Sequence, residues 1–403
     1  MLREASDKRK KIVSIIGFFS IPISGFVTDI YLPSFPSMSK ALMVNESSIQ
    51  LTLTCFLLSY GLSQLFIGSI LDAIGRYYPK IVALIVVLLS SLVIASTNSV
   101  LLICILRVIQ GISVAIIVIA TRALFIDIHK PEQAKHYLGY FTIVWSCGPI
   151  LAPFLGGYLE KLFNWHANFY FLAIYAATIL VFELIFSGES IAKKNKLNLK
   201  SMLDTYKMML QNKMFILGIM IQAVAYSIVM IFNIIGPFLI ENVYHFNSVV
   251  IGYSTLILGF SWMIGGFIGK KRMHLDFNES VALPVIVQLS LISILIIAGF
   301  FVQNLYVLLF FAFFIHICSG ILFTSFFTSS MMTFPNNSGV AGGLMGGMTY
   351  ILTSITSFII SSSGKVNTQN GLAIRYFIFS ILLAFVIYIM YRVKSSKKRI
   401  AIR

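Results

Sequence analysis

Two ionisable side chains lie within segments that are otherwise apolar, and they are the first candidates for chemistry. Asp29 lies in SGFVTDIYLPSFPSM, just before Pro33 and Pro36, and Arg107 lies in ICILRVIQGIS. An ionised side chain at the centre of a bilayer costs about 2.5 to 3.5 kcal/mol, so such groups face a partner or a water-filled cavity. Asp29 is therefore either a carboxylate that gains and loses a proton, or a fixed ion pair or cap at a broken helix end.

The two residues are expected at a similar depth. Asp29 lies about five or six residues from the outer end of the first predicted membrane helix, and Arg107 about seven from the outer end of the fourth. Arg107 then either pairs with Asp29 or holds it ready to release a proton. For Arg107 and Gln110 together, organisation of the contact between these helices is as good an explanation as ligand contact.

A second set of charges lies at the inner ends of two predicted helices. Asp72 ends the second helix in GSILDAIGRYYPK, Arg76 follows in a tight turn, and Arg122 and Asp127 end the fourth helix. Contacts among these charges would hold an inner gate shut. The plain alternative is that they are juxtamembrane charges that only mark topology.

The composition indicates which elements position these residues. Of 403 residues, 58% are hydrophobic and 11% are charged, and the mean hydropathy is +0.91. Soluble domains carry about 25% charged residues, so this is a membrane protein. Apolar runs of about 20 residues, long enough to cross a bilayer, predict twelve membrane helices. Their ranges are 12–35, 48–71, 81–97, 100–125, 137–159, 167–187, 214–240, 248–269, 281–301, 304–329, 339–363 and 371–391.

The positive charges follow the predicted topology. Of the 30 Lys and Arg residues, 25 fall on the cytoplasmic side, four fall on the opposite side and Arg107 lies within a helix. This asymmetry fits the positive-inside rule for twelve helices with both termini cytoplasmic. It excludes nucleic acid as a partner, because the charges form no single basic face.

The longest polar stretch divides the chain into two halves. We expect an N-terminal six-helix bundle over 1–187, a cytoplasmic linker over 188–213, and a C-terminal six-helix bundle with a basic tail over 214–403. Two such bundles can rock about a cavity at the membrane midplane. The fifth helix, GYFTIVWSCGPILAPFLGGYL, is rich in Gly and Pro, which predicts close helix packing between the bundles.

The sequence shows no residue pattern typical of a disulfide framework, a metal site or an enzyme active site. The four cysteines all fall within predicted helices without paired short spacing, so neither a disulfide framework nor a metal site is indicated. The hydrophilic segments show no nucleophile and base pair, no metal-ligand spacing and no phosphate-binding loop. We therefore expect no enzyme and no cofactor. The first apolar run is too long for a signal peptide and is expected to remain as an uncleaved helix.

Four motifs together carry a family resemblance. TDIYLPSFPSM, GSILDAIGRYYPK, ILRVIQGISVA and GPILAPFLGGYL, in this order and at these helical positions, resemble the major facilitator superfamily. More closely, they are similar to its Bcr/CflA branch of twelve-helix drug:proton antiporters, and GPFLIENVY at the end of the seventh helix is a further likeness. The resemblance covers nearly the whole chain and implies an all-α polytopic membrane protein with two six-helix bundles around a central cavity.

The resemblance also implies roles for single residues. The helix-one acid implicated in proton coupling corresponds to Asp29, and the helix-four Arg and Gln correspond to Arg107 and Gln110. The antiporter motif of the fifth helix corresponds to Gly148, Pro149, Pro153, Gly156 and Gly157.

The loop motif of the inner gate departs from the family pattern. Ala73 and Tyr77 stand where the family usually has basic residues, so a weaker inner gate is expected. The positions that match the motif are Gly68, Asp72, Gly75 and Arg76.

Helices that face the cavity in this superfamily supply candidate residues for solute binding. Aromatic walls with a few amides suit large, partly apolar solutes. For His316, a neutral histidine hydrogen-bonded to another helix is the favoured explanation, and solute contact is the alternative. The candidates are Tyr31, Gln110, Trp145, Gln222, Tyr226, Asn233, Phe238 and His316.

These expectations lead to one function and two alternatives. We expect a monomeric, proton-coupled antiporter that exports drugs or secreted metabolites across a bacterial cytoplasmic (inner) membrane by alternating access. Its partners are then small molecules, protons and the lipid bilayer. A proton-coupled uptake carrier is the first alternative, and the antiporter motif argues against it. A membrane receptor or scaffold without transport is the second, and Asp29 and Arg107 argue against that.

Overall fold

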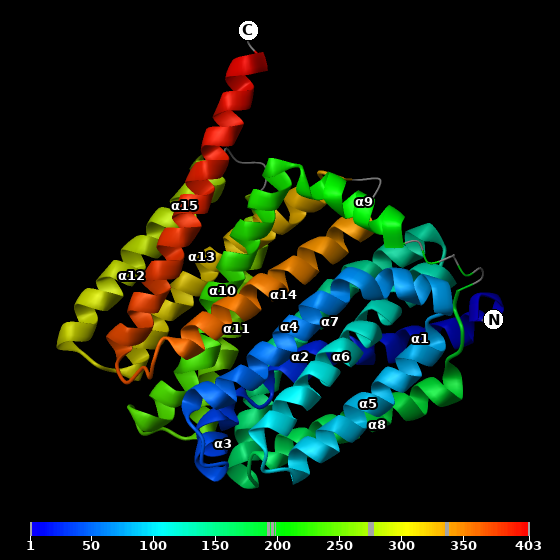
Figure 1. Ribbon diagram of the computed structural model, residues 1–403, viewed down its shortest axis with the longest axis horizontal. Helices are drawn as coiled ribbons and strands as arrows, with labels where there is room; N and C mark the ends of the chain where they lie inside the picture. The colour runs from blue at the N-terminus through cyan, green and yellow to red at the C-terminus, as the bar shows by residue number, and fades with distance from the viewer. Residues whose placement is uncertain are drawn as a thin grey trace. The chain divides into compact units, whose positions relative to one another are not determined.

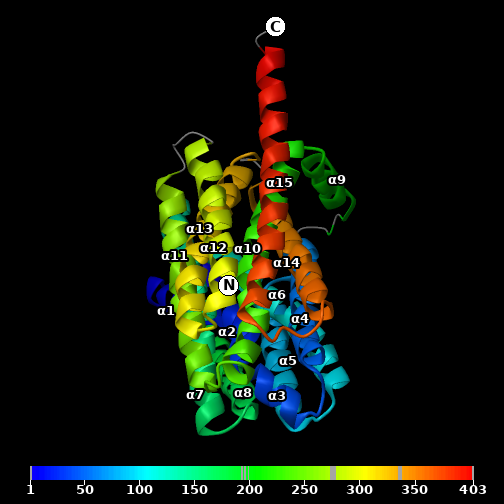
Figure 2. The same ribbon diagram turned by 90° about the vertical axis from the view of Figure 1, so that its left-hand side faces the viewer.

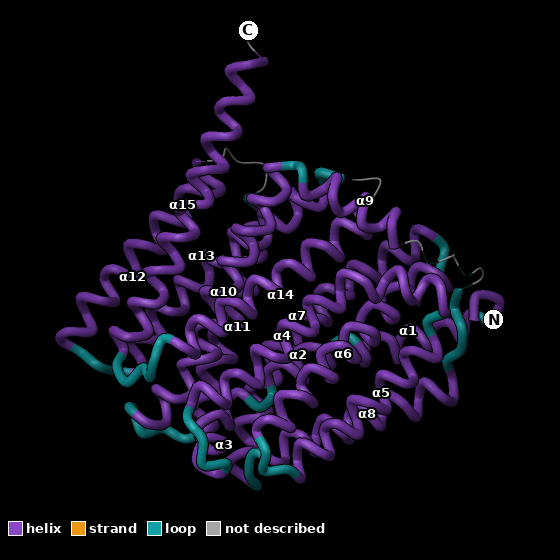
Figure 3. Tube along the Cα trace, in the orientation of Figure 1, coloured by secondary structure: helices purple, strands orange, loops and turns teal. Residues whose placement is uncertain are grey.

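The computed structural model is mainly helical, with short loops between the helices, and the residues that it describes include no strand (Figure 1, Figure 3). These residues are 2–191, 194, 197, 199–272, 278–334 and 338–401. Twelve helical stretches are long and apolar enough to cross a membrane, which confirms the twelve predicted spans. The ends differ by a few residues. The fifth span begins at Pro131 instead of 137, because proline is well tolerated in the first turn of a helix.

The first membrane span is broken twice. It consists of α1 (Asp7–Ser20), α2 (Ile23–Asp29), the 3-10 turn η2 (Leu32–Ser34) and α3 (Phe35–Ala41). Pro22 directly precedes α2, and Pro33 lies within η2. Proline has no N–H to donate and restricts the residue before it, so a continuous helix is not favoured at either place. Asp29 is consequently the last residue of α2, at the second break.

One compact unit comprises Met1–Met202 and Asn247–Tyr253. After the first span it contains α4 (Glu46–Ile74), α5 (Tyr77–Ser96), α6 (Val100–Ile128), α7 (Pro131–Leu162) and α8 (His166–Phe186). Within this unit α4 packs along α6, α5 packs against α6 and α8, and α2 packs against α7. Side-chain caps fix where two of these helices begin: Asn45 accepts from the amide of Ser48, and Ser99 accepts from the amide of Leu102.

A second unit comprises Leu203–Phe246 and Ser254–Arg403. α10 (Lys213–Asn242) packs against α13 (Leu305–Met331), α14 (Ser338–Ser362) and α15 (Gln369–Ala401), and α12 (Leu283–Phe301) packs against α13 and α15 (Figure 2). The other elements are α9 (Leu199–Leu210), α11 (Ser248–Lys271) and the short π-helical turn η3 (Asn278–Ala282), and α9 and α11 each contain a boundary between the units. Asn212 and Asn304 cap the starts of α10 and α13.

The outer helices are apolar on both faces. On α12, Val285, Ile292 and Leu295 are buried, whereas Ile286, Ile294, Ile297 and Phe300 are 51 to 76% exposed. A helix that is apolar all round is typical of a membrane span, because lipid replaces water on its outer face. The buried polar side chains of the first unit are therefore the exceptions that need explaining.

Candidate functional site

Asp29 is buried where the first membrane span breaks. The residue ends α2 and is 1% exposed. Its Oδ1 atom is enclosed and has no hydrogen-bond partner among the described residues. Buried polar atoms in folded proteins are nearly always hydrogen-bonded, so an atom of this kind points to a role other than packing.

Arg107 lies on α6, is 0% exposed, and binds the end of α2. Its Nη1 donates to the carbonyl oxygen of Val27 at 2.8 Å and to Oε1 of Gln110 at 2.9 Å. Carbonyl groups in the last turn of a helix lack an intrahelical partner, so the carbonyl of Val27 is free to accept. No ion pair joins Arg107 to Asp29 in the described part of the chain, although the charge of Arg107 acts on the Asp29 carboxyl.

Two aromatic rings enclose the guanidinium of Arg107. Its Cζ lies 4.4 Å from the ring centroid of Phe56 and 4.6 Å from that of Tyr31. A cation within about 6 Å of a ring face is attracted by the ring quadrupole. The hydroxyl of Tyr31 lies 3.1 Å from Oγ1 of Thr52, which itself donates to the carbonyl of Ile49, so Tyr31 is the donor. Tyr31 is 0% exposed and forms part of this wall.

Gln110 extends the hydrogen bonds from Arg107 to α5. Its Nε2 donates to Oγ of Ser91 at 3.0 Å, while its Oε1 accepts from Arg107. Nε and Nη2 of Arg107 have no hydrogen-bond partner among the described residues. These two nitrogens can therefore donate to a further acceptor while Nη1 stays bound to Val27 and Gln110.

Gln222 and His316, two predicted solute contacts, are buried within the second unit and have protein partners. Nε2 of Gln222 donates to Oγ1 of Thr349 at 2.8 Å and joins α10 to α14. Nε2 of His316 lies 3.0 Å from the hydroxyl of Tyr376 and joins α13 to α15. Each pair fixes a helix contact, and solute binding by these residues stays a prediction.

The remaining candidates differ in exposure. Phe238 is 2% exposed on α10, whereas Trp145, Tyr226 and Asn233 are partly exposed. An aromatic wall is a surface that suits partly apolar solutes. Tyr226 belongs to one, with ring centroids 5.9, 6.1 and 5.8 Å from those of Trp262, Phe323 and Tyr350.

Glycines of the fifth-helix motif lie where α7 approaches its neighbours. A Cβ atom at Gly148 would lie 2.8 Å from the carbonyl oxygen of Pro22, and one at Gly156 would overlap the carbonyl oxygen of Ile30. Both of these neighbours belong to the broken first span. The carbonyl of Gly157 accepts from Oγ of Ser248 at 3.0 Å. The two prolines of the motif, Pro149 and Pro153, lie against Gly25 and Gly252.

Arg76 forms the centre of a charged cluster at the C-terminal ends of α4 and α6. Its Nη2 lies 2.9 Å from Oδ1 of Asp72, and its Nη1 binds Oδ2 of Asp127. Oδ2 of Asp127 also accepts from Oγ of Ser190 at 2.7 Å. Three of the predicted gate residues are therefore brought together in one unit.

The other predicted gate residues, Gly68, Gly75 and Arg122, take no part in these ion pairs. Gly75 turns the chain between α4 and α5 with φ 105°, a conformation that favours glycine. Arg122 is exposed and forms no ion pair among the described residues. A Cβ atom at Gly68 would meet no described atom within 4 Å.

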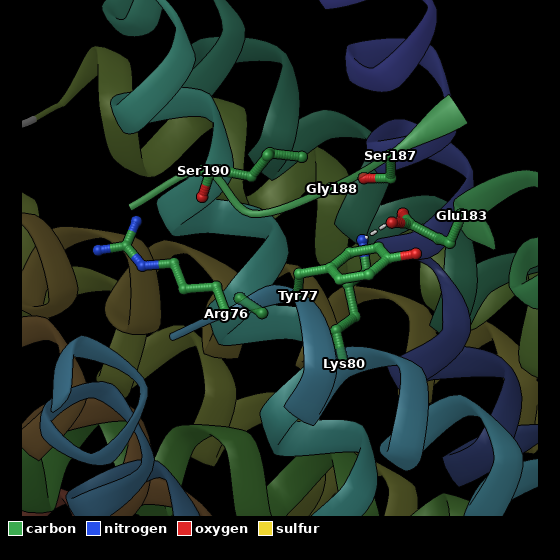
Figure 4. Close-up of a pocket in the computed structure, with 9 residues that line it drawn as sticks. Arg76, Tyr77, Lys80, Glu183, Ser187, Gly188 and Ser190 are labelled. Atoms are coloured by element: carbon green, nitrogen blue, oxygen red, sulfur yellow. Dashed lines mark hydrogen bonds and ion pairs between the residues drawn. The ribbon is translucent and has the colours of Figure 1, made fainter. Parts of the chain in front are cut away.

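Three residues beside this cluster were not predicted: Lys80, Glu183 and Glu189. Nζ of Lys80 and Oε1 of Glu183 lie 2.6 Å apart, with side chains 5 and 1% exposed, and join α5 to α8. Figure 4 shows this pair next to Tyr77, among the residues that line a small pocket. The signal for Glu183 was available, since an acid within an apolar span needs a partner. Glu189 follows the span in a polar stretch and gave no such signal.

Comparison with known proteins assigns the family. A family model described as the Major Facilitator Superfamily matches residues 17–357. The bicyclomycin resistance protein homolog of Haemophilus influenzae is 36% identical over 177 residues, which are 43% of this chain and 44% of that protein. Multidrug resistance protein D of Escherichia coli is 25% identical over 355 residues, which cover 87% of this chain and 88% of that protein. These matches confirm the resemblance to the superfamily and to its Bcr/CflA branch.

Solved structures show the same fold. A bacterial homolog of the human lysosomal transporter Spinster, inward-facing and occupied, has a TM-score of 0.74 at 14% identity and covers 95% of this chain and 96% of its own. The nucleoside transporter NupG has a TM-score of 0.70 at 16% identity and covers 95% of this chain and 99% of its own. With twelve apolar helices and a family match over most of its length, the chain belongs to the major facilitator superfamily and is a multi-pass membrane transporter, not an enzyme.

Proposed function

We propose that the chain is a proton-coupled antiporter that exports small organic molecules across a bacterial cytoplasmic membrane. The observation that carries the proposal is the buried Asp29 carboxyl, whose Oδ1 has no partner among the described residues while Arg107 is bound to Val27. Such an acid can change its protonation state without first breaking an ion pair. Two relatives are named for resistance to bicyclomycin or to multiple drugs, which supports export of organic molecules.

Asp29 and Arg107 give the proposed cycle two states. When Asp29 is ionised, the unused Nε and Nη2 of Arg107 can donate charge-assisted hydrogen bonds to it. When Asp29 is protonated, Arg107 keeps only Val27 and Gln110. Protonation then changes a contact between α2 and α6 at the break in the first span. A shift of α2 would reach α7, because Gly148 of α7 lies against Gly25 of α2 and Gly156 lies against Ile30, the residue that follows α2.

Alternating access completes the proposed mechanism. The six-helix halves 1–187 and 214–403 rock about a central cavity, and each orientation opens it to one side of the membrane. Protonation of Asp29 opposes solute binding from outside, and release of the proton inward resets the carrier. Cytoplasmic termini, a monomeric state and solute contacts at the predicted aromatic and amide residues belong to the same proposal.

A sensitivity panel in a pump-deficient bacterial host tests the proposal. The panel compares the wild type, Asp29→Asn and a control, Asp204→Asn, whose acid is exposed on α9. We expect the wild type and the control to protect the host against at least one compound, and Asp29→Asn to give no protection at equal amounts in the membrane. Equal protection by Asp29→Asn at every external pH would remove Asp29 from the coupling mechanism.

The direction of transport needs a separate measurement. Proteoliposomes are subjected to a pH jump in the presence of a labelled compound from the panel. An antiporter moves the compound against the direction of proton flow, whereas an uptake carrier accumulates it in the same direction. Accumulation with the proton gradient would establish the uptake carrier.

A further inference from the structure

A carboxylate outside the predicted gate caps the helix that follows Arg76. Glu189 lies in the segment after α8, and its two oxygens accept from four backbone amides at 3.0 to 3.3 Å. Arg76 is the N-cap residue of α5 and makes no side-chain cap of its own. The first amides of a helix need acceptors and favour a negative charge. The four amides belong to Arg76, Tyr77, Ser190 and Ile191.

Gly75 makes this approach possible. A Cβ atom at Gly75 would lie 2.5 Å from Oε2 of Glu189, closer than real contacts allow. The backbone of Gly75 also has φ 105°, which residues with a side chain rarely adopt. Two physical constraints therefore favour glycine at position 75: the backbone conformation, and the space that the Glu189 carboxylate occupies.

The segment after α8 also contacts Asp127, the acid that pairs with Arg76. Oγ of Ser190 donates to Oδ2 of Asp127 at 2.7 Å, and that oxygen also binds Nη1 of Arg76. The carbonyl of Glu189 accepts from the amide of Leu2 at 3.0 Å, so the segment is tied down independently. Glu189 thus fixes the backbone of Arg76, and the next residue, Ser190, fixes Asp127, which the side chain of Arg76 binds.

We infer that Glu189 is a positioning residue of the inner gate, which holds the start of α5 so that the guanidinium of Arg76 bridges Asp72 and Asp127. Glu189 makes no contact with solute in this account and acts through Arg76. The gating role rests on the proposed transport function, whereas the capping role rests only on the contacts. The two parts are therefore tested separately.

Hydrogen exchange of the purified full-length protein tests the cap. Glu189→Gln keeps the shape and removes the charge, and Glu132→Gln is the matched control, because Glu132 is exposed in the first turn of α7. Loss of a charged cap is expected to speed exchange of the amides at 76–80 about tenfold. Glu132→Gln is expected to leave them unchanged, and Glu189→Asp, which keeps the charge, to recover part of the protection. Exchange in Glu189→Gln equal to that of the wild type would overturn the inference.

Export of a compound found in the panel tests the gating role. We compare Glu189→Gln, Arg76→Ala and the double variant. If Glu189 acts through Arg76, the double variant loses no more export than Arg76→Ala alone. Losses that multiply would show that Glu189 acts independently of Arg76 and would overturn the gating role. Absence of any exported compound would count against the proposed function, and the exchange result would still decide the cap.

Discussion

Nη1 of Arg107 donates a hydrogen bond to the carbonyl oxygen of Val27 at 2.8 Å, so a buried cation is bound to the backbone of the broken first span. The same guanidinium lies between the rings of Phe56 and Tyr31. Asp29, two residues after Val27, keeps an unpartnered Oδ1 although a positive charge is near. The contact with Arg107 holds the end of α2 in place, and the unpartnered Oδ1 supports the proposal that Asp29 exchanges a proton.

Arg107→Lys is expected to disrupt this contact although it keeps the charge. A lysine ammonium lacks the planar fork that binds Val27 and Gln110 at once and that stacks between two rings. We expect a loss of stability of about 1 to 3 kcal/mol, with export lost as well. Thermal unfolding of the purified protein measures the change, and Arg392→Lys, at an exposed position near the end of α15, serves as the control. An unchanged unfolding temperature for Arg107→Lys would show that the Val27 contact contributes nothing.

The buried pair of Lys80 and Glu183 gives a second prediction. Removing one partner leaves an uncompensated buried charge, so Lys80→Met and Glu183→Leu are each expected to cost about 3 to 5 kcal/mol. The double variant has no unpaired charge and is expected to recover most of the lost stability. Unfolding temperatures of the four proteins test this. Single variants that match the wild type, or a double variant worse than either, would contradict it.

A third prediction concerns the contact between α7 and the first span. Gly156→Ala places a Cβ atom into the carbonyl oxygen of Ile30, and overpacking of this kind is expected to cost about 1 to 3 kcal/mol and to reduce export. Gly139→Ala in the same helix is the control, because a Cβ atom there meets no described atom within 4 Å. That control is expected to be neutral or slightly stabilising, since alanine favours helix more than glycine by about 1 kcal/mol. Equal effects of the two substitutions would refute the close contact.

His129, between α6 and α7, gives a prediction about pH. Burial and the nearby positive charge of Lys10 lower the pKa of His129 below its ordinary value. The ring lies 2.8 Å from Oγ of Ser14 and stacks on Tyr137 with centroids 4.3 Å apart. A lowered pKa means that the unfolded chain binds a proton more readily, so stability falls as the pH drops below about 6.5.

The measurement is the fall in unfolding temperature between about pH 7.5 and pH 5.5, a range that brackets the ordinary pKa of histidine. His129→Gln removes the titrating group and keeps an amide that can bond Ser14, so its fall is expected to be smaller than that of the wild type. A fall as large as that of the wild type would show that other groups cause the pH dependence.

Much of the fold was predictable, because the twelve long apolar runs that form the membrane helices depend only on residue types. The burial of Asp29 and Arg107 was predictable for the same reason, since an ionised group among apolar residues must find protein or a cavity. The partner of Arg107 was not predictable. It depends on which carbonyl the break in the first span leaves free, and that is a property of the folded backbone.

The partners of the other polar residues show the same limit. Gln222 binds Thr349, 127 positions away, and no pattern in a single sequence indicates which helices will pack together. Glu183 was open to prediction by the argument used for Asp29, whereas Glu189 was not. Glu189 caps α5 only because the turn at Gly75 brings the start of α5 to the end of α8.

The most direct test of the central claim is proton movement driven by solute. Proteoliposomes enclosing a pH-sensitive dye are given a gradient of a compound that the protein exports, and the internal pH is followed. The wild type is expected to move protons opposite to the compound, and Asp29→Asn to move the compound down its gradient without a pH change. Proton movement by Asp29→Asn equal to that of the wild type would contradict the account.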